Sequence, residues 1–240
     1  MSNQLKSVDI ILPVYNGQED LEKSVDTIIK FFKSIKFPYK WNIIISDNAS
    51  TDNTPKIARA LAKKYSQVHH LRLTQKGRGI AVRTAWMQSK ADIVSFMDVD
   101  LAVDLEAFPR LINEVAHGAD ICIGSRFLKE SKVKRSLKRE ILSRSYNTIL
   151  KILFQNKFSD AQCGFKAFNT NTVKNVLLEV KDNEWFFDTE LLVKAERAGY
   201  KIKEIPFVWT EGPSTTVKLM KTSFRLLRKA VEFRLSLIFN

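Results

Sequence analysis

The chain has 240 residues, a formal net charge of +13, 45% hydrophobic residues, and only 8 Gly and 6 Pro. This composition excludes a disordered or fibrous protein, because nearly half of the residues are available to build a core, and one domain is the simplest expectation. The two cysteines, Cys122 and Cys163, lie 41 positions apart without a CxxC motif. We therefore expect neither a disulfide framework nor a Cys/His zinc site, and a reducing, cytosolic environment fits best.

The sequence shows no secretion signal and no membrane span. Residues 1–8 contain one Lys and no apolar run, unlike a signal peptide. No stretch approaches the roughly 20 apolar residues of a spanning helix. We therefore expect a chain that does not cross a membrane.

The positive charge is concentrated in two segments of the second half. Residues 126–157 hold ten Lys or Arg against two Glu, a net charge of +8, and residues 216–240 hold six against one, a net charge of +5. The remaining residues are balanced, with 23 basic and 23 acidic side chains. Nucleic acid, anionic lipid and phosphorylated substrates would each explain such segments, and so would a solvated charged face.

Short apolar runs alternate with segments of helical spacing along the first half of the chain, which predicts an α/β fold with a largely parallel sheet and helices on both faces. Thr54 is expected to cap the second helix, with Pro55 at its first position. In chain order, the expected elements are strand Val8–Val14, helix Glu19–Phe32, strand Trp41–Ser46, helix Thr54–Tyr65, strand Val68–Leu73, helix Ile80–Gln88, strand Ile93–Met97, helix Leu105–Val115 and strand Asp120–Gly124.

Ligands of such sheets bind outside the carboxyl ends of the strands, and here these ends are rich in polar residues. The first strand continues into PVYNG and the second into DNASTD, while KGRG, DVD and GSR follow the third, fourth and fifth. Acidic residues thus follow the second and fourth strands, and basic residues follow the third and fifth. This arrangement is typical of a site for a metal-bound diphosphate.

Asp98 and Asp100 leave the fourth strand with one residue between them, so both carboxylates can point to one side. Two such carboxylates can hold Mg²⁺ or Mn²⁺ together with waters and the phosphate oxygens of a substrate. A DxD tripeptide also occurs in ordinary surface loops, but its position after a buried strand favours the metal site.

Three further strand ends carry candidate binding groups. Asp47 can accept hydrogen bonds from a nucleobase edge, but such a residue also caps turns, and both interpretations stay open. Gly77 and Gly79 would let a phosphate approach the backbone at the start of a helix. Arg126 is better placed to hold a diphosphate, because a guanidinium binds phosphate oxygens bidentately.

The chain resembles the family 2 glycosyltransferases of the GT-A fold in a series of motifs that occur in order from about Val8 to Leu219. These motifs are PVYN, DNASTDNT, KGRGIAVRTA, DVD, GSRF, DAQCGFKAF, WFFDTELLVKAERAGYKIKEIPFVW and a closing Ser/Lys segment. Within the family, dolichyl-phosphate β-glucosyltransferases are most similar, with dolichol-phosphate mannose synthases as near relatives. The most specific part is QCGFK followed by WFFDTELL.

The resemblance implies a Rossmann-like sheet and the inverting transfer of one hexose, with glucose favoured, from a nucleotide sugar to a polyprenyl or dolichyl phosphate, assisted by Mg²⁺ or Mn²⁺. It implies that Asp100 is the metal ligand, with Asp98 beside it. Arg126 and Lys218 match cations that touch the diphosphate or the acceptor phosphate. The positions that match donor contacts are Pro13, Tyr15, Asp47, Asp98 and Val99.

The chain departs from the family pattern at several of these motifs. It has SDNAS where relatives usually read DDGS, DVD where they read DAD, and Gly17 where an acidic residue often follows PxYN. The usual Gly-Ser-Lys is extended to a segment from Gly212 to Lys218. Asp160, Asp188 and Glu190 lie in matched motifs, but buried structural carboxylates would fit equally well, and none is assigned as a base.

The last basic segment predicts an amphipathic helix. A helix of this kind can lie in a membrane interface beside anionic lipid, or dock on the domain or a partner helix. We expect residues 1–215 to form a glycosyltransferase domain with a basic helical insertion at about 126–157, and residues 216–240 to form this helix. Its apolar stripe comprises Met220, Phe224, Leu227, Val231, Leu235 and Ile238.

These features predict an enzyme at the cytoplasmic face of a membrane, associated with it peripherally. Nucleic acid is not an expected partner, because the aromatic residues near the basic segments are spaced like core residues and the acidic DVD would be unexplained. The alternatives are a GDP-mannose-dependent polyprenyl-phosphate mannosyltransferase and a family 2 enzyme that acts on a soluble or cell-wall glycan. The sequence leaves the oligomeric state open.

Overall fold

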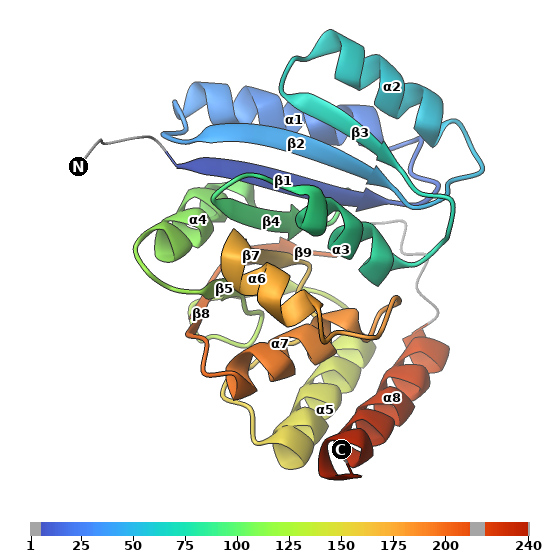
Figure 1. The fold of residues 1–240 in the computed structure, drawn as a ribbon, viewed down its shortest axis with the longest axis vertical. Helices are drawn as coiled ribbons and strands as arrows, with labels where there is room; N and C mark the ends of the chain where they lie inside the picture. The colour runs from blue at the N-terminus through green and yellow to red at the C-terminus, as the bar shows by residue number, and fades with distance from the viewer. Residues whose placement is uncertain (1–5, 212–218, 240) are drawn as a thin grey trace.

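The computed structural model describes residues 6–211 and 219–239 of the chain. A sheet of seven strands in the order β3-β2-β1-β4-β7-β5-β8 forms its centre (Figure 1). All neighbouring strands are parallel except β7, which runs antiparallel to β4 and β5. The strands, including the small sheet β6-β9, are β1 (Ser7–Val14), β2 (Lys40–Asp47), β3 (Val68–Arg72), β4 (Ile93–Met97), β5 (Ile121–Gly124), β6 (Lys132–Lys134), β7 (Phe165–Asn169), β8 (Ile202–Ile205) and β9 (Val208–Thr210).

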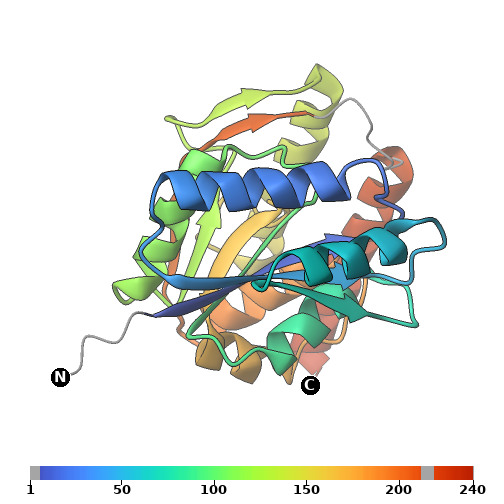
Figure 2. The same ribbon diagram turned by 90° about the horizontal axis from the view of Figure 1, so that it is seen from above.

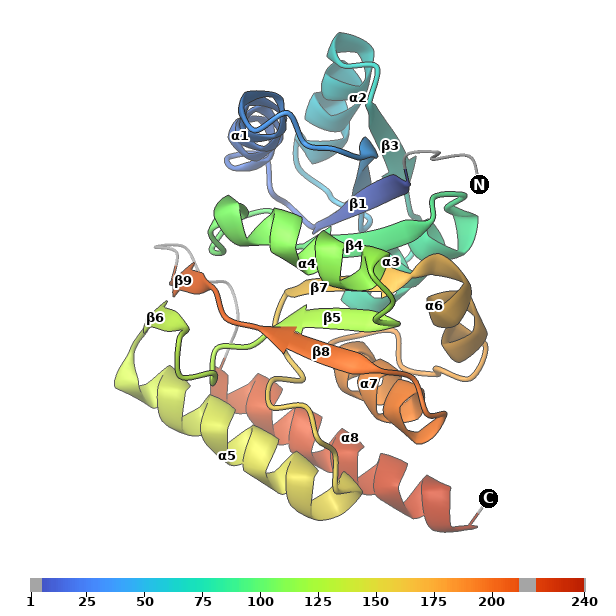
Figure 3. The ribbon, with the colours of Figure 1, turned by 90° about the vertical axis from the view of Figure 1, so that its left-hand side faces the viewer.

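Helices cover both faces of the large sheet. α1, α2 and α4 lie on one face and α3, α6 and α7 on the other (Figure 2). α5 and α8 pack side by side beyond β8 (Figure 3). The helices are α1 (Leu21–Ser34), α2 (Thr54–Lys64), α3 (Arg78–Gln88), η1 (Leu105–Ala107, a 3₁₀ turn), α4 (Phe108–Ala116), α5 (Leu137–Phe154), α6 (Thr170–Leu177), α7 (Phe187–Arg197) and α8 (Leu219–Phe239).

Every strand and helix expected in the first half of the chain is present, and most ends differ by one or two residues. The expected cap of the second helix is wrong. Thr54 is the first helical residue, and the preceding Asn53 occupies the cap position. The Thr54 hydroxyl instead accepts a hydrogen bond from the backbone N–H of Gly17, at 2.9 Å. It therefore ties the segment after β1 to the start of α2.

The sequence analysis placed no strand after Gly124, whereas the structure has four there. The most important of them, β7, contains Lys166 as its second residue, and this lysine is fully buried. A charged residue at that position argues against a buried strand when the sequence alone is considered. The structure resolves this conflict by pairing Lys166 with Asp188, at 2.9 Å.

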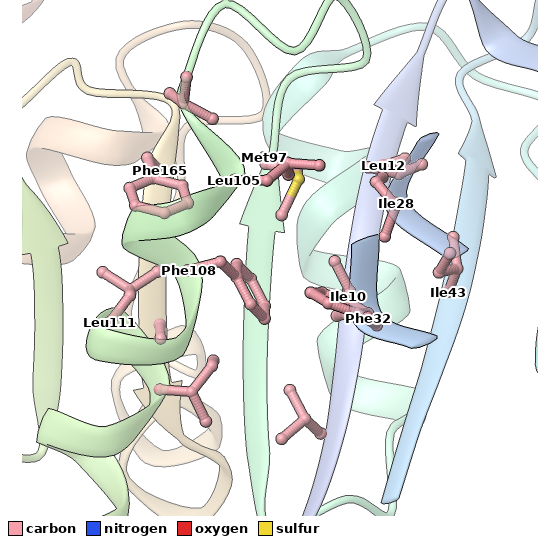
Figure 4. Packing of buried hydrophobic residues seen from close by; sticks show 14 of the residues in the cluster. Ile10, Leu12, Ile28, Phe32, Ile43, Met97, Leu105, Phe108, Leu111 and Phe165 are labelled. Carbon is pink, nitrogen blue, oxygen red and sulfur yellow. The ribbon is translucent and has the colours of Figure 1, made fainter. Parts of the chain in front are cut away.

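Two hydrophobic cores lie on the two faces of the sheet. The two cores explain why β1 is a continuous apolar run, because Ile10 and Leu12 point into one core and Ile11 into the other. In the first core, side chains of α1 and α4 meet those of β1, β2 and β4 (Figure 4). In the second, the fully buried Trp86 contacts the rings of three phenylalanines: Phe96, Phe168 and Phe187.

α8 docks on the rest of the molecule with a face that the sequence analysis did not identify. Leu226, Ala230 and Phe233 are buried, and the ring of Phe233 lies 5.4 Å from that of Phe154. The expected stripe faces mostly outward. Its exposed members are Phe224, Val231, Leu235 and Ile238. The helix therefore has two apolar faces, and docking uses the other one.

Within residues 6–211 and 219–239, no helix is long and apolar enough to span a bilayer. The expected boundary between residues 215 and 216 lies outside the described residues.

Substitutions on the buried and on the exposed face of α8 should have different effects on stability. We expect Phe233→Ala to lower the free energy of unfolding by about 3 kcal/mol, because it removes a buried ring and leaves a cavity. Phe224→Ala, on the same helix but 72% exposed, should change it by less than about 0.5 kcal/mol. Chemical denaturation of both variants measures the difference, and equal effects would contradict the docking described here.

Candidate active site

The carboxyl ends of β1, β2, β4 and β5 meet at one edge of the sheet, together with the beginning of the antiparallel β7. Three non-glycine residues just after these strands have left-handed backbone conformations. They are Asn16, Ala49 and Leu101, with φ of 50°, 57° and 47°. Such conformations cost on the order of 1–3 kcal/mol each and occur preferentially at functional sites. The backbone strain therefore marks the edge at which the sequence placed its candidate residues.

Asp47 lies at the end of β2 with a fully buried side chain. Its Oδ2 accepts a hydrogen bond from Arg72 at 2.5 Å, and its Oδ1 accepts one from the backbone N–H of Ser50 at 3.0 Å. Burial alone would raise the pKa of Asp47, but these hydrogen bonds outweigh it and lower the pKa. The half-exposed Arg72 thus lies between the buried carboxylate and the surface.

Tyr15 and Pro13 lie at the end of β1. The ring of Tyr15 is exposed, and the ammonium of Lys76 lies 3.4 Å from the ring centre, a cation–π contact. Pro13 is partly exposed and pairs in register with Ser46 of β2. The backbone N–H of Gly77 donates to Asn48 at 2.7 Å. The segments that follow β1, β2 and β3 therefore form one continuous surface.

The two carboxylates of the DVD motif have different surroundings. Asp98 accepts a hydrogen bond from the guanidinium of Arg78 at 2.9 Å. Asp100 accepts one from the backbone N–H of Ala102 at 3.2 Å and has no ion pair among the described residues. Loss of hydration, then the charges of Asp98 and Asp20, raise the pKa of Asp100.

Asp100 therefore fits a divalent cation better than Asp98 does, because its charge is uncompensated within the described chain. No group of three or more His, Cys, Asp or Glu side chains in residues 6–211 and 219–239 forms a closed metal site. An ion that takes one or two carboxylates and completes its shell with waters and substrate oxygens is consistent with both observations. Asp20 is a neighbour of this position that the sequence analysis did not identify.

Val99, between the two carboxylates, connects the DVD segment to its surroundings. Its backbone carbonyl accepts a hydrogen bond from the hydroxyl of Ser24 at 2.5 Å. A Cβ atom placed on Gly17 would lie 3.8 Å from the Val99 side chain and only 2.5 Å from that of Val14. Gly17 therefore stands where an acidic residue often occurs because the segment after β1 passes very close to β1 itself.

Arg126 is held by a buried carboxylate. Its Nε and NH2 donate to the two oxygens of Asp160 at 2.7 and 2.8 Å, and its own backbone N–H also donates to Asp160. Burial would lower the pKa of Arg126. The negative charge of Asp160, with a smaller contribution from Asp98, outweighs burial and raises this pKa. Asp160 is thus the partner that fixes Arg126 at this edge.

A small second sheet covers the DVD segment. β6 pairs with β9 in parallel, and Trp209 of β9 also bridges to Val103. The backbone N–H of Thr210 donates to Ala102 at 2.9 Å. The ring of Trp209 lies 5.7 Å from the guanidinium of Arg126. β9 thus joins the segment after β4 to the residue that follows β5.

The interpretation of KGRG as an open phosphate-binding turn is not what the structure shows. A Cβ atom on Gly77 would lie 2.5 Å from the carbonyl oxygen of Asn183, and one on Gly79 would lie 2.6 Å from Cβ of Phe187. The backbone N–H of Ile80 donates to the same Asn183 carbonyl at 3.1 Å. The protein itself occupies the space beside both glycines, which lets α3 pack closely against the start of α7.

The three acidic residues left unassigned are buried and paired. Asp160 binds Arg126, and Asp188 binds Lys166 and Arg78. Glu190 pairs with Lys194 at 2.9 Å and accepts two backbone N–H groups. Both cysteines are unpaired and buried, and burial raises the pKa of the Cys163 thiol to about 12. Lys218, expected at the phosphates, lies outside the described residues.

The family assignment follows from comparison with known sequences. The sequence model described as "Glycosyl transferase family 2" matches residues 9–177. The chain belongs to glycosyl transferase family 2. The expected enzyme class and α/β fold are thereby confirmed.

Three curated relatives of this family 2 glycosyltransferase match most of its length. "Glycosyltransferase AglD" of Haloferax volcanii is 32% identical over 89% of this chain, which spans only 35% of that relative. "Dolichyl-phosphate beta-glucosyltransferase ALG5D" of Trichomonas vaginalis is 30% identical over 96% of this chain and 75% of the relative. The "Dolichol-phosphate mannosyltransferase" of Pyrococcus furiosus is 29% identical over 92% of this chain and 62% of the relative.

Solved structures share the fold of this glycosyltransferase. Glucosyl-3-phosphoglycerate synthase from Mycobacterium tuberculosis, solved with Mn²⁺, UDP and its glucosylated product, superposes with a TM-score of 0.71. The match covers 95% of this chain and 80% of that chain, at 16% identity. This likeness confirms the expected GT-A architecture.

The pairing of Arg126 with Asp160 should be visible in the pH dependence of stability. Because the folded-state pKa of Asp160 lies below its ordinary value, its contribution is fully present above about pH 4 and is lost as the pH falls further. We expect Asp160→Asn to lower the free energy of unfolding by about 3 kcal/mol at neutral pH, since it leaves a buried guanidinium unpaired. The difference from wild type should shrink below about pH 4. Denaturation curves between neutral and acidic pH measure it, and a pH-independent difference would contradict the pairing.

Proposed function

We propose that the chain transfers a hexose, with glucose favoured, from a nucleotide sugar to a polyprenyl or dolichyl phosphate at the cytoplasmic face of a membrane. An oxygen of the lipid phosphate attacks the anomeric carbon, the bond from that carbon to the nucleoside diphosphate breaks, and the configuration inverts. The names of several relatives, among them dolichyl-phosphate β-glucosyltransferases, support this acceptor.

The residues of the site suit this reaction. A phosphate monoester has its second pKa near about 6, so the attacking oxygen is already largely ionised at neutral pH and needs no strong base. The remaining requirement is to stabilise the departing diphosphate. Arg126, fixed by Asp160, supplies a guanidinium for this purpose, and Lys218 is proposed as a second cation. Asp100 would hold Mg²⁺ or Mn²⁺, which neutralises developing negative charge when bound.

The donor would bind along the surface that joins β1, β2 and β4. Tyr15 and Pro13 offer apolar contacts to the nucleoside. Asp47 and Arg72 offer polar contacts to the edge of its base. Asp98 and Val99 would lie toward the ribose and diphosphate. The proposal allows either a uridine or a guanosine nucleotide sugar as the donor.

The proposal of a lipid acceptor is supported by the apolar side chains exposed on α5 and α8. These two helices pack side by side (Figure 3). On α8, exposed apolar residues alternate with basic residues such as Arg225 and Arg228. Apolar residues flanked by cations are typical of a helix face that lies in the interface of an anionic bilayer. These side chains are Leu137, Ile141 and Ile152 of α5 and Phe224, Val231, Leu235 and Ile238 of α8.

Transfer to a lipid phosphate tests the proposal directly. With Mn²⁺ or Mg²⁺ and either dolichyl or undecaprenyl phosphate, we expect UDP-glucose to give a glucosylated lipid detectable by mass spectrometry. GDP-mannose and a soluble glycan acceptor are the competing arms. Transfer to the soluble glycan alone would contradict the lipid acceptor.

Asp100→Ala should remove metal-dependent transfer, with at least about a hundredfold loss of kcat/KM, because the uncompensated carboxylate at the site is gone. The fold should be unchanged, since Asp100 makes one backbone hydrogen bond and no ion pair among the described residues. Circular dichroism checks the fold. Full activity of this variant in EDTA would show that the metal assignment is wrong.

The membrane role of α8 has its own test. Phe224→Ala should weaken binding to vesicles that contain anionic phospholipid by about tenfold, because a large exposed ring contributes roughly 1.5–3 kcal/mol when it enters an apolar environment. Stability should be unaffected. Sedimentation with vesicles measures binding, and unchanged binding of a combined Phe224→Ala and Leu235→Ala variant would contradict the membrane role.

A further inference from the structure

Four charged side chains form a continuous line of ion pairs that ends at the DVD motif. Lys166 lies 2.9 Å from Asp188, Asp188 lies 2.5 Å from Arg78, and Arg78 lies 2.9 Å from Asp98. The side chains of Lys166, Asp188 and Arg78 are at most 10% exposed, whereas that of Asp98 is 47% exposed. The line therefore runs from the interior to the edge of the site, and its charges alternate.

Asp98 is held from a second direction by the backbone. A Cβ atom on Gly164, in the segment that leads into β7, would lie 1.9 Å from Oδ2 of Asp98. Arg78 binds the other oxygen, Oδ1. The carboxylate thus lies between a guanidinium that binds one oxygen and a glycine that leaves room for the other.

Arg78 is itself fixed by its packing. Its guanidinium carbon lies 4.9 Å from the ring centre of Phe96 and 5.2 Å from that of Trp185. Its two terminal nitrogens bind different carboxylates, those of Asp188 and Asp98. Burial opposes the charge, but the two carboxylates outweigh it and raise the pKa of Arg78.

The glycines on either side of Arg78 allow its side chain to lie between Asp188 and Asp98. Both glycines lie so close to the segment 183–187 that a Cβ atom would collide with it. They allow the first turn of α3 to close on the start of α7, where Asp188 lies. The KGRG motif thereby directs its arginine inward, between two carboxylates.

We propose that Arg78 is a positioning residue of the donor site, which holds Asp98 in the orientation that a nucleotide sugar requires. This inference rests on the proposed function in treating Asp98 as a donor contact. Arg78 offsets the repulsion between Asp98 and the nearby Asp100. It also fixes the carboxylate before the donor arrives, so that binding does not have to order it. Asp188 and Lys166 hold Arg78 in turn, and the diphosphate is bound by other cations.

The first experiment compares Arg78→Gln and Arg78→Lys with a control on the same helix. Arg83→Gln is that control, because the hydrogen bonds of Arg83 within the described part of the chain go to the backbone carbonyls of Val180 and Asp182 and to no carboxylate. Calorimetric titration with UDP-glucose and Mn²⁺, and with GDP-mannose in parallel, measures donor affinity. We expect Arg78→Gln to weaken it at least tenfold and Arg78→Lys to restore part of the loss. Arg83→Gln should stay within twofold of wild type, and the KM for the lipid acceptor should be unchanged in all three.

A second experiment displaces the side chain of Asp98 by a substitution at Gly164, which leaves every charged residue in place. Gly164→Ala should weaken donor binding at least tenfold in the wild-type background, because the new methyl group takes the place of Oδ2. In an Asp98→Ala background the same change should cost less than threefold, since the colliding carboxylate is absent. This comparison remains informative even if Arg78→Gln does not fold.

The outcomes separate this inference from the proposed function. Donor affinity within twofold of wild type in Arg78→Gln, or an equal effect of Gly164→Ala in both backgrounds, overturns the positioning role. Wild-type protein that binds a nucleotide sugar but transfers nothing to a lipid phosphate overturns the proposed acceptor alone. Wild-type protein that binds neither nucleotide sugar overturns both.

Discussion

The direction of one strand determines how this site is assembled. β7 lies between β4 and β5 and runs against both. Its beginning, not its end, therefore lies at the edge where the other strands finish. This reversal brings Gly164 against Asp98 and carries Lys166 into the interior, where it meets Asp188. A wholly parallel sheet would have placed these residues at the opposite edge, away from the DVD motif.

Buried charge is the second constraint, and at the candidate site it is satisfied by ion pairs. Asp47 with Arg72, Asp160 with Arg126 and the line that ends at Asp98 each place a carboxylate beside a guanidinium. Such pairs add little net stability compared with apolar packing, but they fix orientation. Asp100 differs from these residues, because it is exposed and has no ion pair among the described residues, which leaves its charge available to a cation from outside the chain.

Much of the fold could be predicted from local patterns. β1 and β2 are continuous apolar runs, and α1 has clear helical spacing, because each buries its side chains in the expected way. β7 and β9 could not be predicted, since a short strand that contains a lysine and a strand of three residues give no local signal. The motif residues were located correctly at the strand ends. Their partners were missed, because Arg72, Gly164 and Asp20 become neighbours of the site only through long-range contacts.

The role of α8 shows a related limit. Periodicity identifies an apolar stripe, but it does not decide whether that stripe faces the protein or the solvent. Here a second face, with the small Ala230 at its centre and Phe233 beside it, fits against α5 and α7. The basic segments that dominate the net charge thus belong to helices that pack with the domain and still expose apolar side chains.

The bridge between β9 and the segment after β4 has a consequence for synthesis of the chain. The contacts around the segment after β4 come from Gly164, which approaches Asp98, from Asp188, which binds Arg78, and from Thr210, which donates to Ala102 and is synthesised more than a hundred residues after the motif. A ribosome-bound chain that has emerged only through α6 contains the whole region matched by the family model, yet lacks Asp188 and the strand that closes over Val103. The strands up to β7 are made before Asp188 and β9, so the candidate site is completed only when later segments of the chain are made.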